Sequence, residues 1–564
     1  MTVGLKPARV LRGERIEARF GENPWEIAGL KNLATGQAIC RRGTHSLVIR
    51  LASRVSDPVF LTRIVAVDES AGGLRISAAD ETFSCTASLF LTVTPEGLRC
   101  EAEVTAPEPV WMAEWKISGL GLRGVVVPAL GGQALSKRMP AGTTLSYKYP
   151  FWWSAPFILG ETAGGGFWLR SMDARPAFRL ARVKRTGGGF DITFGFEADA
   201  PLVATTLRAA WYIDCYAGTW RVPVDEYRAW MENAFHLTPL ERRTDLPAWV
   251  RGISAVLEIW GIGKDSPVPL HTFREMAGRL RAWARIHPPG ETLLYMPGFA
   301  GKGIDSGAPD YTPAEALGGK EGLRELVALA RSMGFRTMLH TNVLAMTFDH
   351  PLFGQFKEHQ VVDAFGRVQG WGLDIDGDWL AEPYFAYINP GAPAWGDLMV
   401  TVIGKLIADY GVDAIFLDQT LLAFNVSRGP NFIAGMREHI RRLRREFPGV
   451  LFAGEGLHEQ VCEVLPVAQI HGIDSIAEVH GAEGRFPWRS AHPVSARLFG
   501  PYTIYTPHLL TRHPSHPMFR LQEAAYRRLG VMPALCLYHR DQQMNIPAVR
   551  AMLRRVGRPA GRKR

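Results

Sequence analysis

Long apolar runs are absent from this 564-residue sequence. No stretch reaches the ~20 apolar residues that a membrane-spanning helix needs. Residues 1–20 carry charges throughout and lack the apolar core of ~7 to 15 residues that a secretory signal requires. We therefore expect a cytoplasmic protein that neither crosses nor binds a membrane.

Cysteine is scarce: six residues are scattered without a CxxC pair or the spacing of zinc ligands. This pattern predicts buried, reduced thiols. Neither a GxxxxGK[ST] loop nor a strand-linked GxGxxG occurs, which argues against nucleotide-dependent enzymes. Acidic residues are also fewer than basic ones, and the net charge is +9. Six basic residues lie within 554–564, so we expect residues 551–564 to form a solvated, disordered tail, with an anionic partner as the alternative. No nucleic-acid partner is expected.

Short alternating segments, broken by Gly, Pro and Asn or Asp turns, fill the first part of the chain. They predict an antiparallel β-sandwich. Its aromatic clusters, around Trp111 and Trp115 and in residues 147–153, suit either the core or a sugar-stacking platform. Residues 222–235 predict a helix with Pro223 in its first turn, and a Pro-rich, charged connector follows. We place the boundary of the sandwich, residues 1–245, there.

From residue 246 to about 550 the pattern changes to strand, loop and helix in repetition. This alternation predicts a TIM-type (β/α)8 barrel, and hence a multidomain β plus α/β protein. The expected strands are 254–260, 292–297, 336–342, 413–418, 450–455, 475–480, 502–507 and 532–538.

The stretch VDAIFLDQT, residues 412–420, is the centre of this pattern. An amphipathic helix precedes it, Gly411 ends that helix, and an apolar strand then stops on Asp418. Chemistry in such barrels takes place where the strands end. Asp418 is therefore a catalytic candidate, whereas Asp413 at the start of the strand is expected to be structural.

Polar side chains recur where the expected strands end. Asp418 and Glu455 lie on neighbouring strands, and Gly454 and Gly456 flank the glutamate. Glycosidic cleavage needs two carboxyl groups, one to protonate the leaving oxygen and one to meet the developing positive charge. Further candidates for contacts with sugar are Glu258, Trp260, His340, Asn342, Gln419, His458, His480 and His508.

Residues 343–392 are too many for an ordinary connection after a barrel strand. Long loops of this kind in compact domains are commonly lids or binding segments. The acids Asp374, Asp376 and Asp378 lie in this segment, but their spacing differs from that of an EF-hand. They predict a solvated acidic turn, with a calcium site or a substrate contact as alternatives.

The connector with LPAW, the segment GVDAIFLDQT and the GEG triplet resemble retaining α-glycosidases and the endo-α-N-acetylgalactosaminidase-like group. In these families a galactose-mutarotase-like sandwich precedes the barrel, and a bacterial family of glycosidase-like proteins has the same layout. The resemblance implies Asp418 as nucleophile and Glu455 as acid/base. The arginine found two residues before the nucleophile in α-amylases is Phe416 here, so α-amylase activity is not implied.

The sequence thus predicts a glycoside hydrolase that acts on an α-linked glycan through two carboxylates and needs no cofactor or metal. Two alternatives stay open. One is a catalytically silent carbohydrate-binding protein, and the other is a metal-dependent barrel hydrolase that uses several of the histidines. The sugar, the linkage, retention or inversion, and the oligomeric state are not determined by these patterns.

Overall fold

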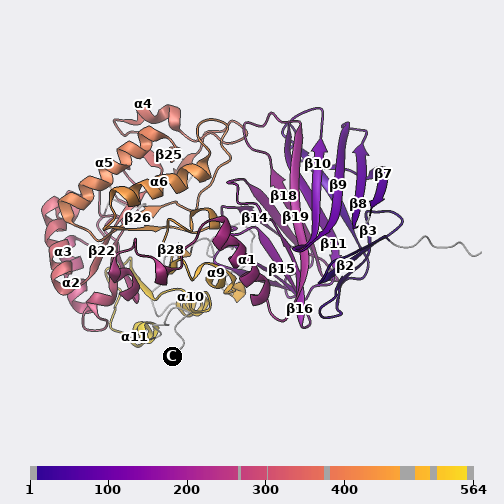
Figure 1. Cartoon of the computed structure of the whole chain (residues 1–564). Coiled ribbons are helices and arrows are strands. Elements are labelled where there is room, and N and C mark those ends of the chain that lie inside the picture. The colour runs from indigo at the N-terminus through magenta and orange to yellow at the C-terminus, as the bar shows by residue number, and fades with distance from the viewer. Residues whose placement is uncertain are drawn as a thin grey trace, which may run out of the picture. The chain divides into compact units, whose positions relative to one another are not determined.

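The computed structural model describes residues 9–70, 72–263, 268–301, 303–373, 382–470, 489–508 and 517–554. The chain divides into two units, Met1–Ala234 and Phe235–Arg564, and each is described here by itself (Figure 1). The predicted boundary near residue 245 stays a prediction. The acids Asp374, Asp376 and Asp378 lie outside the described residues, as does His480.

Unit 1 is built from two antiparallel sheets. Sheet A has the order β1-β2-β3-β5-β11-β18-β17-β14, with β4 beside β3 and β6 beside β5; sheet B has the order β13-β12-β15-β16-β19-β10-β9-β8-β7. The strands of sheet A are β1 (Arg9–Arg12), β2 (Ile16–Phe20), β3 (Glu26–Asn32), β4 (Ala38–Cys40), β5 (Gly43–Leu51), β6 (Val59–Phe60), β11 (Val110–Leu120), β14 (Thr144–Tyr149), β17 (Arg179–Arg185) and β18 (Phe190–Glu197). Those of sheet B are β7 (Arg63–Ser70), β8 (Gly73–Asp80), β9 (Cys85–Thr94), β10 (Gly97–Thr105), β12 (Gly124–Val127), β13 (Gln133–Ser136), β15 (Phe157–Thr162), β16 (Gly165–Arg170) and β19 (Thr206–Ala217).

Aromatic rings fill the space between the two sheets. Trp211 of sheet B lies 5.9 Å from Trp115 and 5.4 Å from Phe196, both of sheet A, measured between ring centroids. Its indole N–H donates to the carbonyl of Phe194 at 2.9 Å. Trp115 and Trp153 are both buried, so these two aromatic residues belong to the core. Helix α1 (Arg221–Ala234) follows the last strand, as the sequence predicted.

Unit 2 is an eight-stranded parallel sheet that is nearly closed. Its order is β29-β28-β27-β26-β22-β21-β20-β30, which follows the chain around the barrel apart from the return of β30 to β20. The predicted fold class, a sandwich followed by a (β/α)8-type barrel, is confirmed. The strands are β20 (Ala255–Ile259), β21 (Thr292–Met296), β22 (Arg336–Asn342), β26 (Ala414–Asp418), β27 (Leu451–Gly454), β28 (Val467–Ile470), β29 (Ile504–Pro507) and β30 (Ala534–Leu537).

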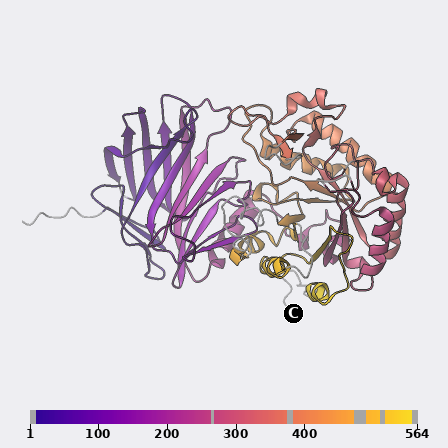
Figure 2. The same ribbon diagram turned by 180° about the vertical axis from the view of Figure 1, so that it is seen from behind.

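Helices alternate with these strands, and Figures 1 and 2 show α2, α3 and α5 outside the sheet. Sequence signals set their ends: Thr272 and Glu275 form a capping box at α2, and Gly411, with φ 63°, ends α5 as predicted. The helices are α2 (Phe273–Trp283), α3 (Gly319–Met333), α5 (Pro393–Tyr410), α6 (Phe432–Glu446), α9 (Val494–Phe499), α10 (Pro517–Arg528) and α11 (Pro547–Arg554). No helix in the described part of the chain is both long and apolar enough to cross a membrane.

The sixth strand differs from the sequence prediction. The structure places β28 (Val467–Ile470) in that position, ahead of the predicted segment 475–480, which lies outside the described residues. Strand β28 is only four residues long and includes the polar Gln469, so its sequence shows neither an apolar run nor a clear alternation. The other seven predicted strands each overlap a strand of the barrel.

The long segment 343–392 forms a small sheet of its own. Strands β23 (Ala345–Thr347), β24 (Gly370–Leu373) and β25 (Glu382–Tyr387) pair antiparallel in the order β23-β25-β24, and a short helix, α4 (Phe353–Phe356), lies between β23 and β24. We call this the insert sheet. It follows β22, so it begins at the end of the barrel where the strands finish.

Candidate active site

Polar side chains gather at the carboxyl ends of the barrel strands. Asp418 is the last residue of β26, and Glu455 follows the last residue of β27. Both are buried, although they are carboxyl groups. Buried carboxyl groups at this end of a parallel barrel are the expected place for chemistry.

Asp418 is held from the neighbouring strand. The side-chain amide of Asn342, the last residue of β22, lies 3.4 Å from an oxygen of Asp418 and donates to Oε1 of Gln419 at 3.1 Å. The oxygen of the same amide accepts the backbone N–H groups of Leu344 and Ala345 at 3.1 and 2.9 Å. Asn342 is therefore fixed on both sides, and its amide N–H groups point to the turn after β26.

Glu455 is tied to the residue that follows Asp418. Its Oε2 accepts the backbone N–H of Gln419 at 2.9 Å, and its Oε1 lies 3.7 Å from Nε2 of His508. Gln419 has φ 63°, a left-handed conformation that side chains other than glycine rarely adopt. This turn joins the segment of Glu455 to the residue that follows Asp418.

Glycines on either side of Glu455 allow this approach. A Cβ atom at Gly456 would lie 2.6 Å from Cβ of Leu421, and one at Gly454 would lie 2.5 Å from Oγ1 of Thr420. Thr420 also donates its hydroxyl to the carbonyl of Gly456 at 3.2 Å. The two glycines thus let the segment around Glu455 pack against the turn after β26.

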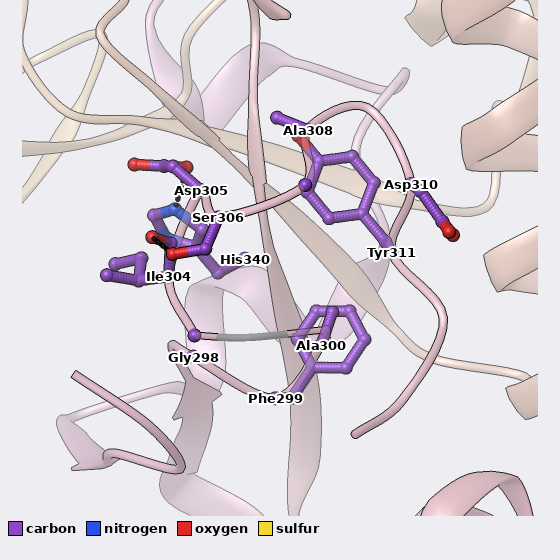
Figure 3. A pocket seen from close by; sticks show the side chains of 12 residues that line it. Gly298, Phe299, Ala300, Ile304, Asp305, Ser306, Ala308, Asp310, Tyr311 and His340 are labelled. Atoms are coloured by element: carbon purple, nitrogen blue, oxygen red, sulfur yellow. Dashed lines mark hydrogen bonds and ion pairs between the residues drawn. The ribbon is translucent and has the colours of Figure 1, made fainter. Parts of the chain in front are cut away.

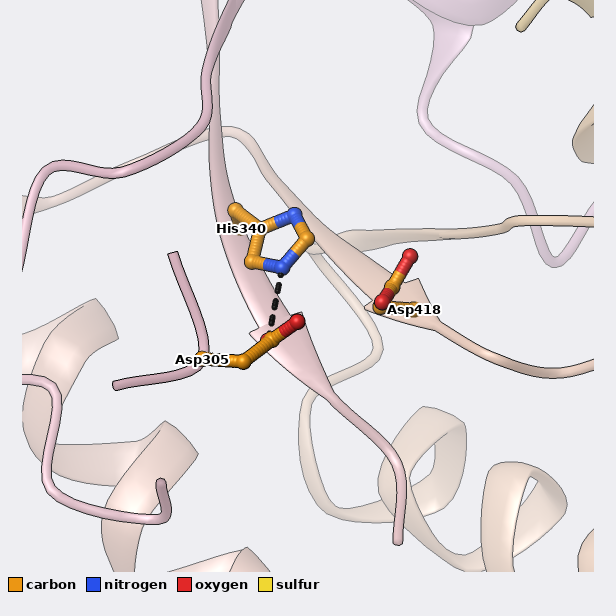
Figure 4. Close-up of side chains that lie close together, drawn as sticks. All are labelled: Asp305, His340 and Asp418. Atoms are coloured by element: carbon orange, nitrogen blue, oxygen red, sulfur yellow. Dashed lines mark hydrogen bonds and ion pairs between the residues drawn. The ribbon is translucent and has the colours of Figure 1, made fainter. Parts of the chain in front are cut away.

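A hydrogen-bonded chain of Tyr295, His340 and Asp305 lies beside Asp418. Nε2 of His340 is 3.0 Å from Oδ1 of Asp305 (Figure 4). Its Nδ1 is 2.7 Å from the hydroxyl of Tyr295. When Asp305 is ionised it only accepts hydrogen bonds, and Nε2 of His340 is then the donor to it. In a neutral imidazole of that tautomer, Nδ1 accepts the tyrosine O–H. One ligand-type atom from each of Asp305, His340 and Asp418 lies within 4.8 Å of the others.

The charges in this region are carboxylates. Burial raises the pKa of Tyr295 well above its ordinary value, and Glu258, Asp418, Asp305 and Glu455 raise it further. Burial likewise raises the pKa of Tyr311, with further contributions from Asp305 and Asp418. Both phenols therefore stay protonated, and the described acids around Tyr295 favour positive charge there.

Asp305 was not predicted from the sequence. It lies in the glycine-rich loop 297–318 after β21, has φ 58°, and lines a pocket with His340 (Figure 3). The insert sheet holds this loop: Thr347 donates its backbone N–H to the carbonyl of Ala308 at 2.9 Å, and Tyr384 contacts Ser306 through their hydroxyls. The sequence feature that could have pointed to Asp305 is an acid within a glycine-rich loop that follows the end of a strand.

The insert sheet also reaches the turn after β26. The side-chain amide of Gln419 donates to the hydroxyl of Tyr387, in β25, at 3.3 Å. Burial raises the pKa of Tyr387, and its phenol is thus protonated. The insert sheet therefore positions two parts of the candidate site, the Asp305 loop and Gln419.

Glu258 and Trp260 form a separate buried pair where β20 ends. The indole N–H of Trp260 donates to Oε1 of Glu258 at 2.5 Å. Burial raises the pKa of Glu258 to about 7, although hydrogen bonds from Trp260 and Cys536 oppose this shift. Glu258 therefore changes its charge near neutral pH.

His458 is not joined to this cluster by a described contact. It is buried, and burial together with the nearby charge of Arg437, on α6, lowers its pKa to about 3. The imidazole is therefore neutral and lies toward helix α6. Its role as a ligand for substrate stays a prediction, as do the other assigned roles.

No family model and no curated protein matches the chain by sequence. Solved structures share its fold. The ligand-free alpha-N-acetylgalactosaminidase NagBb from Bifidobacterium bifidum is 16% identical with a TM-score of 0.73, covering 98% of this chain and 94% of that one. Its GalNAc complex is 15% identical with a TM-score of 0.72, covering 98% and 93%. TtGalA, an alpha-galactosidase from Thermus thermophilus, is 16% identical with a TM-score of 0.51, covering 89% and 93%.

Replacing Glu258 by glutamine should change how stability depends on pH. The folded chain keeps the Glu258 proton up to about pH 7, whereas the unfolded chain loses it near 4.5. The folded state therefore binds more protons between these values, and stability falls as pH rises. As pH rises from 4.5 to 7, we expect the free energy of unfolding of Glu258→Gln to increase by about 3 kcal/mol relative to that of the parent. Urea unfolding at several pH values measures this, with the exposed Glu446→Gln as control. Parallel pH profiles for Glu258→Gln and the parent would contradict the shift.

Gly456→Ala should disturb the site through packing alone. The new Cβ would meet Leu421 at 2.6 Å, so the turn after β26 must move, at a cost of about 1–3 kcal/mol. Gly449→Ala is the matched control, because a Cβ there meets nothing within 4 Å. Thermal unfolding of both variants tests this expectation. Equal stability of the two variants would mean that the turn and the Glu455 segment are less tightly packed.

Proposed function

We propose that the chain is a glycoside hydrolase that cleaves an α-linked glycan with Asp418 and Glu455. The observation that carries the proposal is the hydrogen bond from the Gln419 amide to Glu455. It puts the second carboxyl group beside the residue that follows the first. The proteins of similar fold named above are an alpha-N-acetylgalactosaminidase and an alpha-galactosidase, which suggests galactose or N-acetylgalactosamine as the sugar.

Each carboxyl group has a defined task in this proposal. Asp418 attacks the anomeric carbon while Glu455 protonates the leaving oxygen. A glycosyl ester on Asp418 results, and Glu455 then takes a proton from the incoming water, whose oxygen replaces Asp418 at the anomeric carbon. Asn342 holds Asp418 during attack, and the Gln419 amide and His508 hold Glu455.

The surrounding carboxylates suit the charge of the reaction. The transition state has oxocarbenium character, so positive charge develops at the sugar. Four acids each raise the pKa of Tyr295 through their charge, which indicates that they lie around the same phenol: Asp305, Asp418, Glu455 and Glu258. Sugar hydroxyls would meet Asn342, Gln419, His508 and the Asp305–His340 pair, with Glu258 and Trp260 behind them. Both nitrogens of His340 are engaged, so His340 acts here by holding Asp305.

Asp418→Asn and Glu455→Gln should each lower turnover at least about a hundredfold. Both changes keep the shape of the side chain and remove its carboxylate. Hydrolysis of p-nitrophenyl α-galactoside and its N-acetylgalactosamine counterpart measures the loss, and the exposed pair Asp409→Asn and Glu446→Gln serves as control. Unchanged turnover in either site variant would remove that residue from the mechanism.

Azide separates the two roles. In Asp418→Ala it should restore turnover and give a glycosyl azide of inverted configuration, because azide takes the place of the nucleophile. In Glu455→Ala it should attack the glycosyl ester and give the retained configuration. If the parent binds these sugars without turnover, the silent binding protein is the better description.

A metal-dependent hydrolase is the second candidate, and the cluster of Asp305, His340 and Asp418 favours it. Carboxylate oxygens and imidazole are common ligands of divalent cations, and His340 could donate its other N–H to Tyr295. Binding through Nε2 would, however, break the present bond to Asp305.

Metal analysis of the purified protein decides between these candidates. The glycosidase proposal predicts less than one bound metal per chain at this cluster and turnover that survives a chelator. Stoichiometric metal that is lost in Asp305→Asn, with turnover lost on chelation, would favour the metal-dependent hydrolase.

A further inference from the structure

A groove of about 470 Å³ is lined by residues of unit 1 alone. Strands β9, β10 and β19 of sheet B and the loop after β16 line it. Along β10 and β19, buried residues alternate with more exposed ones, and the exposed rows line the groove. This volume falls in the range of ~300–1,000 Å³ that small-molecule sites occupy.

A short side chain makes the hollow. On β19 the outward row is Arg208, Ala210 and Tyr212, and on β10 the residues opposite them are Glu103, Glu101 and Arg99. Ala210 therefore leaves open the space between Arg208 and Tyr212, which lie about 13 Å apart along the strand at ~3.3 Å per residue. This space is about the size of a sugar ring with its hydroxyls.

Two aromatic rings border this space. Phe90, opposite Glu101 on β9, is 36% exposed, and Tyr212 lies beneath the guanidinium of Arg99 at 5.8 Å. Tyr212 is half-buried, and the guanidinium of Arg75 lies 4.9 Å from the ring centroid of Phe90. The parts of these rings that stay exposed among polar groups offer an apolar surface to a ligand that is otherwise polar. The C–H face of a pyranose has this character.

The charges of the groove balance. Arg99 pairs with Glu101 at 2.5 Å, Arg208 with Glu103 at 2.6 Å, and Arg175 with Asp173 at 2.9 Å. An anionic ligand would have to displace a carboxylate from its arginine. A neutral ligand with adjacent hydroxyl groups can instead donate to a carboxylate and accept from its arginine.

We propose that this groove binds a neutral saccharide, with one sugar ring over Ala210 between Tyr212 and Phe90. Its lining residues do not include Asp418 or Glu455, and the proposal does not depend on the role proposed for them. It would attach the chain to a glycan whether or not the barrel cleaves it.

The test uses the full chain with Asp418→Asn, so that no sugar is consumed. Saturation-transfer NMR titrations with methyl α-galactoside, N-acetylgalactosamine and lactose measure binding, and inorganic phosphate is the charged comparison. Ala210→Tyr fills the hollow without removing a charge. Ala66→Tyr is the matched control, because Ala66 is an exposed alanine on β7 of the same sheet, outside the groove.

We expect at least one saccharide to bind in a component that Ala210→Tyr and Glu101→Gln each weaken at least tenfold. Ala66→Tyr should leave that component unchanged, and any binding that persists in Ala210→Tyr belongs to the barrel. A parent protein that shows no turnover would contradict the proposed glycosidase function but would leave the groove proposal unaffected. The groove proposal is overturned if no saccharide signal depends on Ala210, or if phosphate binds there in place of sugar.

Discussion

The hydrogen bond between the Gln419 amide and the Glu455 carboxylate fixes the geometry of the candidate site. It requires a left-handed Gln419 and the close packing that Gly454 and Gly456 allow. A non-glycine residue in this conformation costs about 1–3 kcal/mol and persists where the surroundings impose it. Asn342 and Tyr387 supply that surrounding by binding the Gln419 side chain. The turn, the insert sheet and both carboxyl groups therefore form one connected structure.

The second constraint is the gathering of buried acids. Like charges disfavour one another, and burial raises the pKa of a carboxyl group, as it does for Glu258. A fold selected for stability alone would place such groups on its surface. The barrel instead keeps four of them near Tyr295. This concentration of acids is useful where a cationic transition state must be stabilised, and a sugar-cleaving site meets that description.

Local sequence patterns were enough to predict most of the barrel and three of the four acids near Tyr295, namely Glu258, Asp418 and Glu455. Asp418 and Glu455 come at the ends of apolar strands. The apolar pattern of a strand and the acid at its end can both be recognised from a few neighbouring residues. The sixth strand was misplaced because its four residues, one of them the polar Gln469, are too few to show a period. Asp305 was missed because its position depends on the path of a long loop and on contacts from Thr347 and Tyr384, which are distant in sequence. The insert sheet was likewise foreseen as a long segment, but not as three strands.

The same reasoning explains why the strand-end residues separate into groups. Sequence order places Glu258, His340, Asn342, Asp418 and Glu455 at one end of the barrel, yet it does not fix their side-chain directions. Asn342 turns toward Asp418, whereas His340 is held by Tyr295 and Asp305, and His458 lies toward α6. The direction of Asn342 follows from the register of neighbouring strands, because Asn342 pairs with Asp418. The others depend on loops, and in a barrel of this kind loops are where one chain differs from another of the same fold.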